Sequence, residues 1–142
     1  ATVGASSMIT DMPEIISSGV HDRFPDLIWV AVETGCGWIP YILEQLDDRW
    51  WRNRSWLPVP LQHEPSHYFR RNWRATFMID HMAIRNRSAL GVENLMWSTD
   101  YPHHGCDWPE SRRVLNGLFR GVPADERQRL CAGNAMALYG LG

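Results

Sequence analysis

The residues best suited to chemistry lie in the segment LMWSTDYPHHGCDWPESRR, residues 95–113, where an apolar run stops at Ser98-Thr99-Asp100. Asp100 follows residues that are expected to be buried, so its carboxylate should point into a cavity at the end of a strand. Burying a carboxylate there is costly unless a cation, a hydrogen-bond donor or a metal ion compensates its charge. Alternatively, Asp100 caps the turn at Tyr101-Pro102 by accepting hydrogen bonds from backbone amides. The sequence pattern alone leaves both interpretations open.

Two histidines and a cysteine follow Asp100, and these residue types are usual zinc ligands. They are His103, His104 and Cys106. Adjacent histidines point in different directions in most backbone conformations, so at most one should face the cavity. The spacing matches none of the usual structural zinc patterns, which argues against a closed zinc site made from this segment alone.

Two other apolar segments also end in polar residues. One is followed by Glu33, Thr34 and Cys36, and the other by Asp80 and His81. In parallel α/β folds, functional groups collect at the C-terminal ends of the strands. Glu33 could orient a substrate or a histidine, or it could be a solvated charge. Asp80 and His81 could transfer a proton, but we favour a helix cap formed by Asp80.

The elements that would position these residues alternate between strands and helices. Runs rich in apolar and β-branched residues predict buried strands. Proline, glycine and capping residues mark the helix ends, with Thr10 or Asp11 as the first cap and Pro13 in the first turn. The predicted strands are 27–33, 75–80 and 94–100; the predicted helices are 10–24, 40–54, 82–91, 107–120 and 123–139, and residues 55–73 form an irregular loop.

This alternation predicts an α/β fold with parallel strands covered by helices. Three strands are few for such a fold, because a closed (β/α)8 barrel needs about 250 residues. We therefore interpret residues 1–142 as a single partial domain of a larger α/β structure.

The composition excludes several classes of protein. Fourteen basic and sixteen acidic residues give a net charge of −2, which provides no basic surface for nucleic acid or an anionic membrane. No apolar run reaches the roughly 20 residues of a membrane-spanning helix. Three widely spaced cysteines suit a reducing cytoplasm better than a disulfide framework. The sequence also lacks the P-loop, G-x-G-x-x-G and G-x-S-x-G motifs.

Several blocks in order resemble the C-terminal half of the amidohydrolase-related family, which includes aminocarboxymuconate-semialdehyde decarboxylase and aromatic-acid decarboxylases. The resemblance runs from about Asp11 to Leu141. It is carried by SGVHDRFPDLIWVAVETGCGWIPYILEQLD, PSHYFRRNWRATFM, GVENLMWSTDYPHHGCDWPESR and GNAMALYGL.

The resemblance implies a metal-dependent TIM barrel of which this chain supplies about strands 6–8. It implies that Asp100 is a ligand of a divalent metal, zinc by expectation, and helps to orient or deprotonate the metal-bound water or the substrate. It places His103 near the substrate, with Glu33 and Thr34 on the opposite wall. The implied reaction is hydrolysis or non-oxidative decarboxylation of a small carboxylated or cyclic substrate.

Two departures from the family pattern limit the transfer of that mechanism. Thr34 stands where the decarboxylases often have a catalytic histidine, and the family's His-x-His pair and a further metal-binding histidine have no counterpart. We therefore expect no tight metal binding by this chain alone. An exposed parallel edge should lead it to associate with another copy or with the missing N-terminal half. The second hypothesis is a non-catalytic fragment or an assembly and binding subunit.

Overall fold

Three short parallel strands form the centre of the molecule. The computed structural model describes the backbone of residues 2–142 and the side chains of residues 7–142. The strand order is β1-β2-β3. Ala31 pairs with Ala75, and Phe77 pairs with Trp97, so all three C-terminal ends reach the same edge of the sheet. The predicted parallel α/β fold is therefore confirmed. The strands are β1 (Trp29–Ala31), β2 (Trp73–Phe77) and β3 (Leu95–Trp97).

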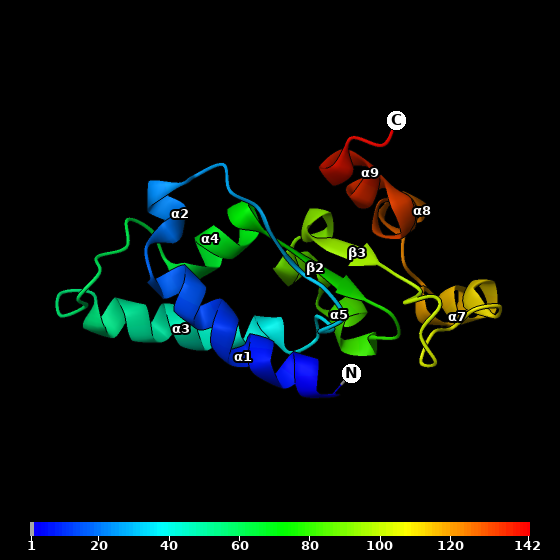
Figure 1. The fold of residues 1–142 in the computed structure, drawn as a ribbon, viewed down its shortest axis with the longest axis horizontal. Helices are drawn as coiled ribbons and strands as arrows, with labels where there is room; N and C mark the ends of the chain where they lie inside the picture. Colours follow the sequence, from blue (N-terminus) through cyan, green and yellow to red (C-terminus); the bar gives the residue numbers. More distant parts are fainter. Residues whose placement is uncertain (1) are drawn as a thin grey trace.

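Helices cover the sheet on either side of the strands. Figure 1 shows α1 to α4 grouped at one end of the molecule and α7 to α9 at the other, with the sheet between them. No helix in the described part of the chain is long and apolar enough to cross a membrane. The helices are α1 (Thr2–Ser17), α2 (Val20–Arg23), α3 (Ile39–Asn53), α4 (Pro65–Asn72), α5 (His81–Arg85), α6 (Arg87–Leu90), α7 (Ser111–Leu118), α8 (Ala124–Gln128) and α9 (Asn134–Tyr139), with a 3₁₀ turn η1 (Val92–Asn94) and a π turn η2 (Arg129–Gly133).

The predicted start of the first helix is wrong. The helix α1 already begins at Thr2, so Pro13 lies inside it and not in its first turn. The hydroxyl of Thr10 donates to the carbonyl oxygen of Ser7 at 2.8 Å, a bond that a threonine can make within a helix. Gly19, with φ 71°, ends this segment and starts α2.

The predicted irregular loop contains a helix that the sequence analysis missed. Within residues 55–73, α4 begins at Pro65, a residue suited to the first helical position. The amide of Ser66 donates to Asp47 Oδ1 in α3 at 2.8 Å. The cap of α4 therefore comes from a residue 19 positions away, which local sequence patterns do not reveal.

Two asparagine side chains connect the starts of the strands to neighbouring segments. Asn94 is fully buried, and its Nδ2 donates to the carbonyl oxygens of Phe69, Arg70 and Trp73 at 3.3, 2.9 and 2.7 Å. The partly buried Asn134 donates from its Nδ2 to the carbonyl oxygens of Val92 and Leu95. These bonds add donors to backbone acceptors on both sides, so the starts of β2 and β3 are held together.

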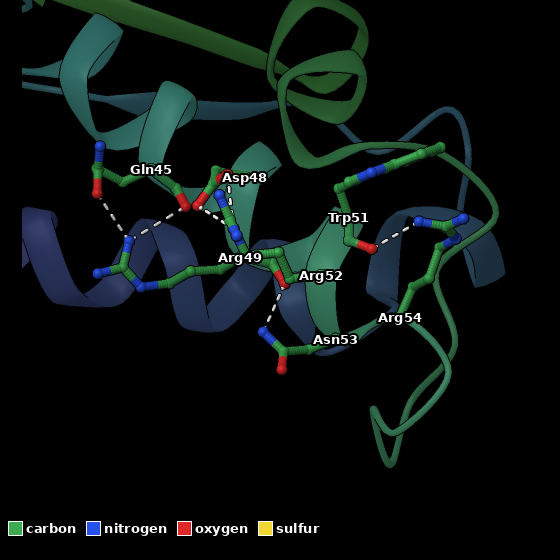
Figure 2. A network of polar contacts seen from close by, with 7 residues as sticks. All are labelled: Gln45, Asp48, Arg49, Trp51, Arg52, Asn53 and Arg54. Carbon is green, nitrogen blue, oxygen red and sulfur yellow. Dashed lines mark hydrogen bonds and ion pairs between the residues drawn. The ribbon is translucent and has the colours of Figure 1, made fainter.

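The exposed end of α3 is stabilised by local polar contacts instead (Figure 2). Arg52 Nε lies 2.9 Å from Asp48 Oδ1, and Arg49 donates to Gln45 Oε1 at 2.8 Å. Both pairs are four residues apart on an exposed helix, where such contacts contribute only a few tenths of a kcal/mol. Exposed residues at this end of α3 are therefore suitable control positions for substitutions in the core.

Replacing Asn94 with alanine should lower the free energy of unfolding by about 2 kcal/mol, because three carbonyl oxygens each lose a hydrogen bond from a buried amide. The control is Asn53→Ala, which removes one exposed bond to the carbonyl oxygen of Arg49 and should cost less than about 0.5 kcal/mol. Urea unfolding followed by tryptophan fluorescence measures both. Equal midpoints for the two variants would contradict this account of the fold.

A second prediction concerns the pH dependence of stability. His21 is fully buried, and its Nε2 accepts a hydrogen bond from Trp73 Nε1 at 2.9 Å. Burial, followed by the positive charge of Arg71, lowers the pKa of His21 below 6.5. The unfolded chain then binds a proton more readily than the folded chain. The contribution of neutral His21 to the free energy of unfolding should therefore be fully present above pH 6.5. It should be lost as the pH falls through the lowered pKa.

Urea midpoints at pH 8 and pH 5.5 test this expectation. The variant His21→Gln removes the titrating ring while keeping a side chain that can accept from Trp73, so its midpoint should change less between the two pH values. Identical changes in both proteins would show that His21 is not responsible.

Candidate active site at the strand ends

Two carboxylate residues directly follow the outer strands in an unusual backbone conformation. Glu33 has φ 61° and Asp100 has φ 59°, and they are the residues other than glycine with positive φ in the described chain. The left-handed region costs an L-residue about 1–2 kcal/mol. Strained residues of this kind cluster at functional sites. Both stand at the edge of the sheet where the sequence analysis placed the candidate site.

Glu33, Asp100 and His103 come together at this edge. Each offers one carboxylate oxygen or ring nitrogen, and these atoms lie within 4.8 Å of one another. His103 Nδ1 is 3.0 Å from Asp100 Oδ2. The side chain of Asp100 is only 14% exposed, whereas that of His103 is 66% exposed. Asp100 therefore lies at the base of the cluster and His103 lies on its open side.

The two carboxyl groups shift each other's pKa in opposite directions. Their hydrogen bond raises the pKa of Glu33, and the negative charge of Asp100 raises it further. The same hydrogen bond lowers the pKa of Asp100, and the hydrogen bond and charge of His103 lower it as well. Asp100 is therefore the more acidic of the two carboxyl groups.

The alternative role of Asp100 as a turn cap is taken by its neighbour. The amide of Tyr101 donates to Thr99 Oγ1 at 3.1 Å. The carboxylate of Asp100 instead contacts Glu33 and His103, while its backbone carbonyl accepts from the amide of His103 at 2.8 Å. The geometry therefore leaves the carboxylate of Asp100 directed toward the cluster.

A cavity of about 360 Å³ opens beside the cluster. Thr34 is 7% exposed and lines this cavity, with its hydroxyl donating to the carbonyl oxygen of Gly35 at 3.2 Å. Thr76, Ser98 and Asp107 also line it, and of these the sequence analysis assigned no role to Thr76. A hydroxyl within a strand, as in Thr76, carries no local signal of function, because Thr is common in strands.

The remaining candidates lie outside the cluster. His104 is exposed, and Cys106 Sγ is 4.0 Å from the carbonyl oxygen of Trp108. Cys36 is fully buried, and burial raises the pKa of its thiol well above the usual value, so the thiol stays protonated and inert. Asp80 caps α5 by accepting from the amide of Ala83 at 2.8 Å, as favoured above.

The cluster has the donors that a divalent metal ion requires. Donor atoms bound to one such ion lie roughly 3–4.4 Å apart, given metal–ligand distances of about 2.0–2.2 Å. The separations in the cluster, all within 4.8 Å, are close to this range. Two carboxylates and one imidazole suit manganese or zinc. Three donors would leave further coordination positions to other groups.

Parallel strands with covering helices form an α/β fold in which functional groups collect at the C-terminal edge, where Glu33 and Asp100 lie. A family model described as "Amidohydrolase" matches residues 4–141. The chain therefore belongs to the amidohydrolase family, as the resemblance in the sequence predicted. A comparison with curated proteins found no match.

Solved structures agree with this fold. The 5-carboxyvanillate decarboxylase of Sphingomonas paucimobilis is 31% identical, with a TM-score of 0.78 over 94% of this chain and 39% of that protein. A dihydroxybenzoic acid decarboxylase of a Polaromonas species, with bound manganese and 2-nitroresorcinol, is 20% identical, with a TM-score of 0.79 over 96% of this chain and 41% of that one. An amidohydrolase of Mycobacterium avium subsp. paratuberculosis is 19% identical, with a TM-score of 0.81 over 97% and 34% of the two chains.

The chain thus spans between about a third and two fifths of the length of these proteins. The two structures with lower identity support the fold alone. Together with the family match, the structures confirm the expected relation to TIM-barrel amidohydrolases and decarboxylases.

The left-handed backbone at Glu33 can be tested by stability measurements. Glycine adopts positive φ without the steric cost that a Cβ atom brings, so Glu33→Gly should relieve strain. Glu33→Ala removes the carboxyl group equally but retains the Cβ atom, which makes it the matched control. We expect the glycine variant to be more stable than the alanine variant by about 1 kcal/mol in urea unfolding. A glycine variant that is no more stable than the alanine variant would exclude strain at this position.

Proposed function

We propose that residues 1–142 are the C-terminal part of a metal-dependent enzyme that decarboxylates or hydrolyses a small carboxylated or cyclic substrate. The observation that carries this proposal is the convergence of Asp100, Glu33 and His103 beside a cavity at the C-terminal edge of a parallel sheet. Membership of the amidohydrolase family and the 31% identity to a decarboxylase support it.

Asp100 would hold the metal ion, together with ligands that this chain does not supply. Its negative charge is maintained by the hydrogen bond from Glu33 and by His103, so it is ready to bind a cation. Manganese, which is bound in one similar structure, fits this oxygen-rich set at least as well as the zinc expected from the sequence. The bound ion would supply Lewis acidity to a substrate oxygen or a water molecule.

The other side chains would bind and orient the substrate. Glu33, whose pKa is raised by its contact with Asp100, could donate a hydrogen bond to a substrate oxygen when it is protonated. His103, on the exposed side of the cluster, can contact a carboxylate entering the cavity. Thr34 lines the cavity and would contact a substrate there. Because Thr34 has no group that titrates near neutral pH, we assign proton transfer to Glu33, Asp100 and His103.

Replacing Asp100 with asparagine in the natural polypeptide that contains these residues should reduce bound manganese or zinc below 0.1 equivalent. It should also lower kcat/KM by at least about a hundredfold, because the charged metal ligand is lost. Asp48→Asn removes an exposed carboxylate of α3 and should change neither quantity. Suitable probes are 5-carboxyvanillate and dihydroxybenzoates, with carbon dioxide release distinguishing decarboxylation from hydrolysis. Full activity and full metal content in Asp100→Asn would refute the proposal.

A second candidate function is assembly through the open side of the sheet. Val32 and Ile79, which follow β1 and β2, are 55% and 59% exposed and would supply apolar area to such a contact. They would contact a second copy or the N-terminal half of a barrel. The three free cysteines are consistent with a cytoplasmic location for such an assembly. Sedimentation velocity of the wild type and of Val32→Asp, combined with elemental analysis, separates a metal-free assembly subunit from an enzyme.

A further inference from the structure

Glu33 lies in a loop that is held mainly by residues of the neighbouring strand and its C-terminal loop. The amide of Glu33 donates to Thr76 Oγ1 in β2 at 3.0 Å. The thiol of Cys36 lies 3.4 Å from the carbonyl oxygen of the same threonine. Thr76 is 8% exposed, so this hydroxyl is sheltered from water and competes little with solvent for the amide. The bond ties the second residue after β1 to the C-terminal part of β2.

Asp80 holds the remainder of the same loop. Its Oδ2 accepts from the amides of Cys36 and Gly37 at 2.7 and 2.8 Å. Its Oδ1 accepts from the amide of Ala83, which is the cap of α5. One carboxylate therefore joins the loop after β1 to the helix after β2. Carboxylates that accept several backbone amides form the stronger class of hydrogen bonds.

The glycines of the loop fit closely against Asp80. A Cβ atom on Gly37 would lie 2.7 Å from Asp80 Oδ1 and 2.7 Å from Met82 Cβ. Gly35 has φ 66°, and a Cβ atom there would lie 3.2 Å from Asp80 Oδ2. The loop can approach the carboxylate this closely because both positions lack side chains. The sequence G-C-G after Thr34 is thus explained by the approach to Asp80.

We infer that Thr76 and Asp80 are positioning residues that hold Glu33 in its left-handed conformation with its carboxyl group against Asp100. This inference rests on the proposed function, because it takes the contact between Glu33 and Asp100 to be part of the proposed metal site. The strand β2 separates β1 from β3, so the two carboxyl groups meet only if the chain after β1 turns across the end of β2. The hydroxyl of Thr76 and the carboxylate of Asp80 lie where that turn is made.

The test measures manganese binding by calorimetry at pH 8 in the natural polypeptide that contains these residues. Glu33→Gln should weaken binding about tenfold, the effect of removing one negative charge near 5 Å from a divalent ion in a watery site. Thr76→Val keeps the shape of the side chain but removes the hydroxyl acceptor, and it should weaken binding about threefold. Thr76→Ser retains the hydroxyl and should bind like the wild type. The double variant Glu33→Gln/Thr76→Val should bind no more weakly than Glu33→Gln alone.

The controls separate positioning from a general loss of structure. The inference would be overturned if Thr76→Val weakened manganese binding equally with and without Glu33. It would also be overturned if Thr76→Ser weakened binding as much as Thr76→Val does. Asp80→Asn provides a second perturbation. Asparagine has one oxygen and one NH2 group, so its NH2 group must face either the loop amides of Cys36 and Gly37 or the amide of Ala83. Asp80→Asn should not weaken manganese binding further once Glu33 is replaced by glutamine. A further loss of affinity in that double variant would count against the positioning role of Asp80.

Crystal structures of the Thr76 variants provide a measurement that needs no metal. Glu33 should leave its contact with Asp100 in Thr76→Val and keep it in Thr76→Ser; an unchanged contact in Thr76→Val would overturn the inference. If Asp100→Asn binds manganese as well as the wild type does, the proposed metal site fails. The crystal structures then decide the positioning role on their own.

Discussion

The parallel register of the three strands is the constraint on which the candidate site depends. Because β2 pairs with both neighbours in the same direction, the chain leaves every strand at one edge of the sheet. Neighbouring strands are about 4.8 Å apart, so β1 and β3 are separated by about 10 Å with β2 between them. Glu33 and Asp100 nevertheless touch, and their left-handed backbones show how the chain turns from the two outer strands toward the middle.

That contact brings two acidic groups together in a manner that favours cation binding. A pair of charged carboxylates repels each other, which raises the pKa of Glu33, while the contacts of Asp100 with Glu33 and His103 lower the pKa of Asp100. A divalent ion would relieve the repulsion and attract both groups. The cost of the strained backbone and of the paired acids is offset by the rest of the sheet, where Asn94 and Asn134 bind the strand starts to their neighbours. Stability is therefore concentrated at one end of the strands and potential chemistry at the other.

The sequence was sufficient to predict the features that depend on local patterns. Buried parallel strands appear as apolar runs, and each strand overlaps its predicted run. β1 and β3 are shorter than their runs, whereas β2 begins two residues before its run, at Trp73, which was predicted to lie in the irregular loop. Features set by distant residues were not predicted. The helix α4 is capped by Asp47 from α3, and Thr10 bonds within a helix although threonine usually marks a helix start. The cluster itself could only be anticipated as three separate strand ends, because the strand order and the two positive φ angles depend on tertiary structure.

The same reasoning explains why the ligand and cap interpretations of Asp100 could not be separated by sequence. Both require an aspartate before a turn, and the choice depends on which neighbour satisfies the amide of Tyr101. Thr99 does so, which leaves the carboxylate of Asp100 free to face Glu33 across the end of β2. A second hydroxyl, that of Thr76, satisfies the amide of Glu33 on the opposite side. Each carboxylate residue thus has a hydroxyl that satisfies a backbone amide of its own turn, and this keeps the two acidic side chains available to one another and to a cation.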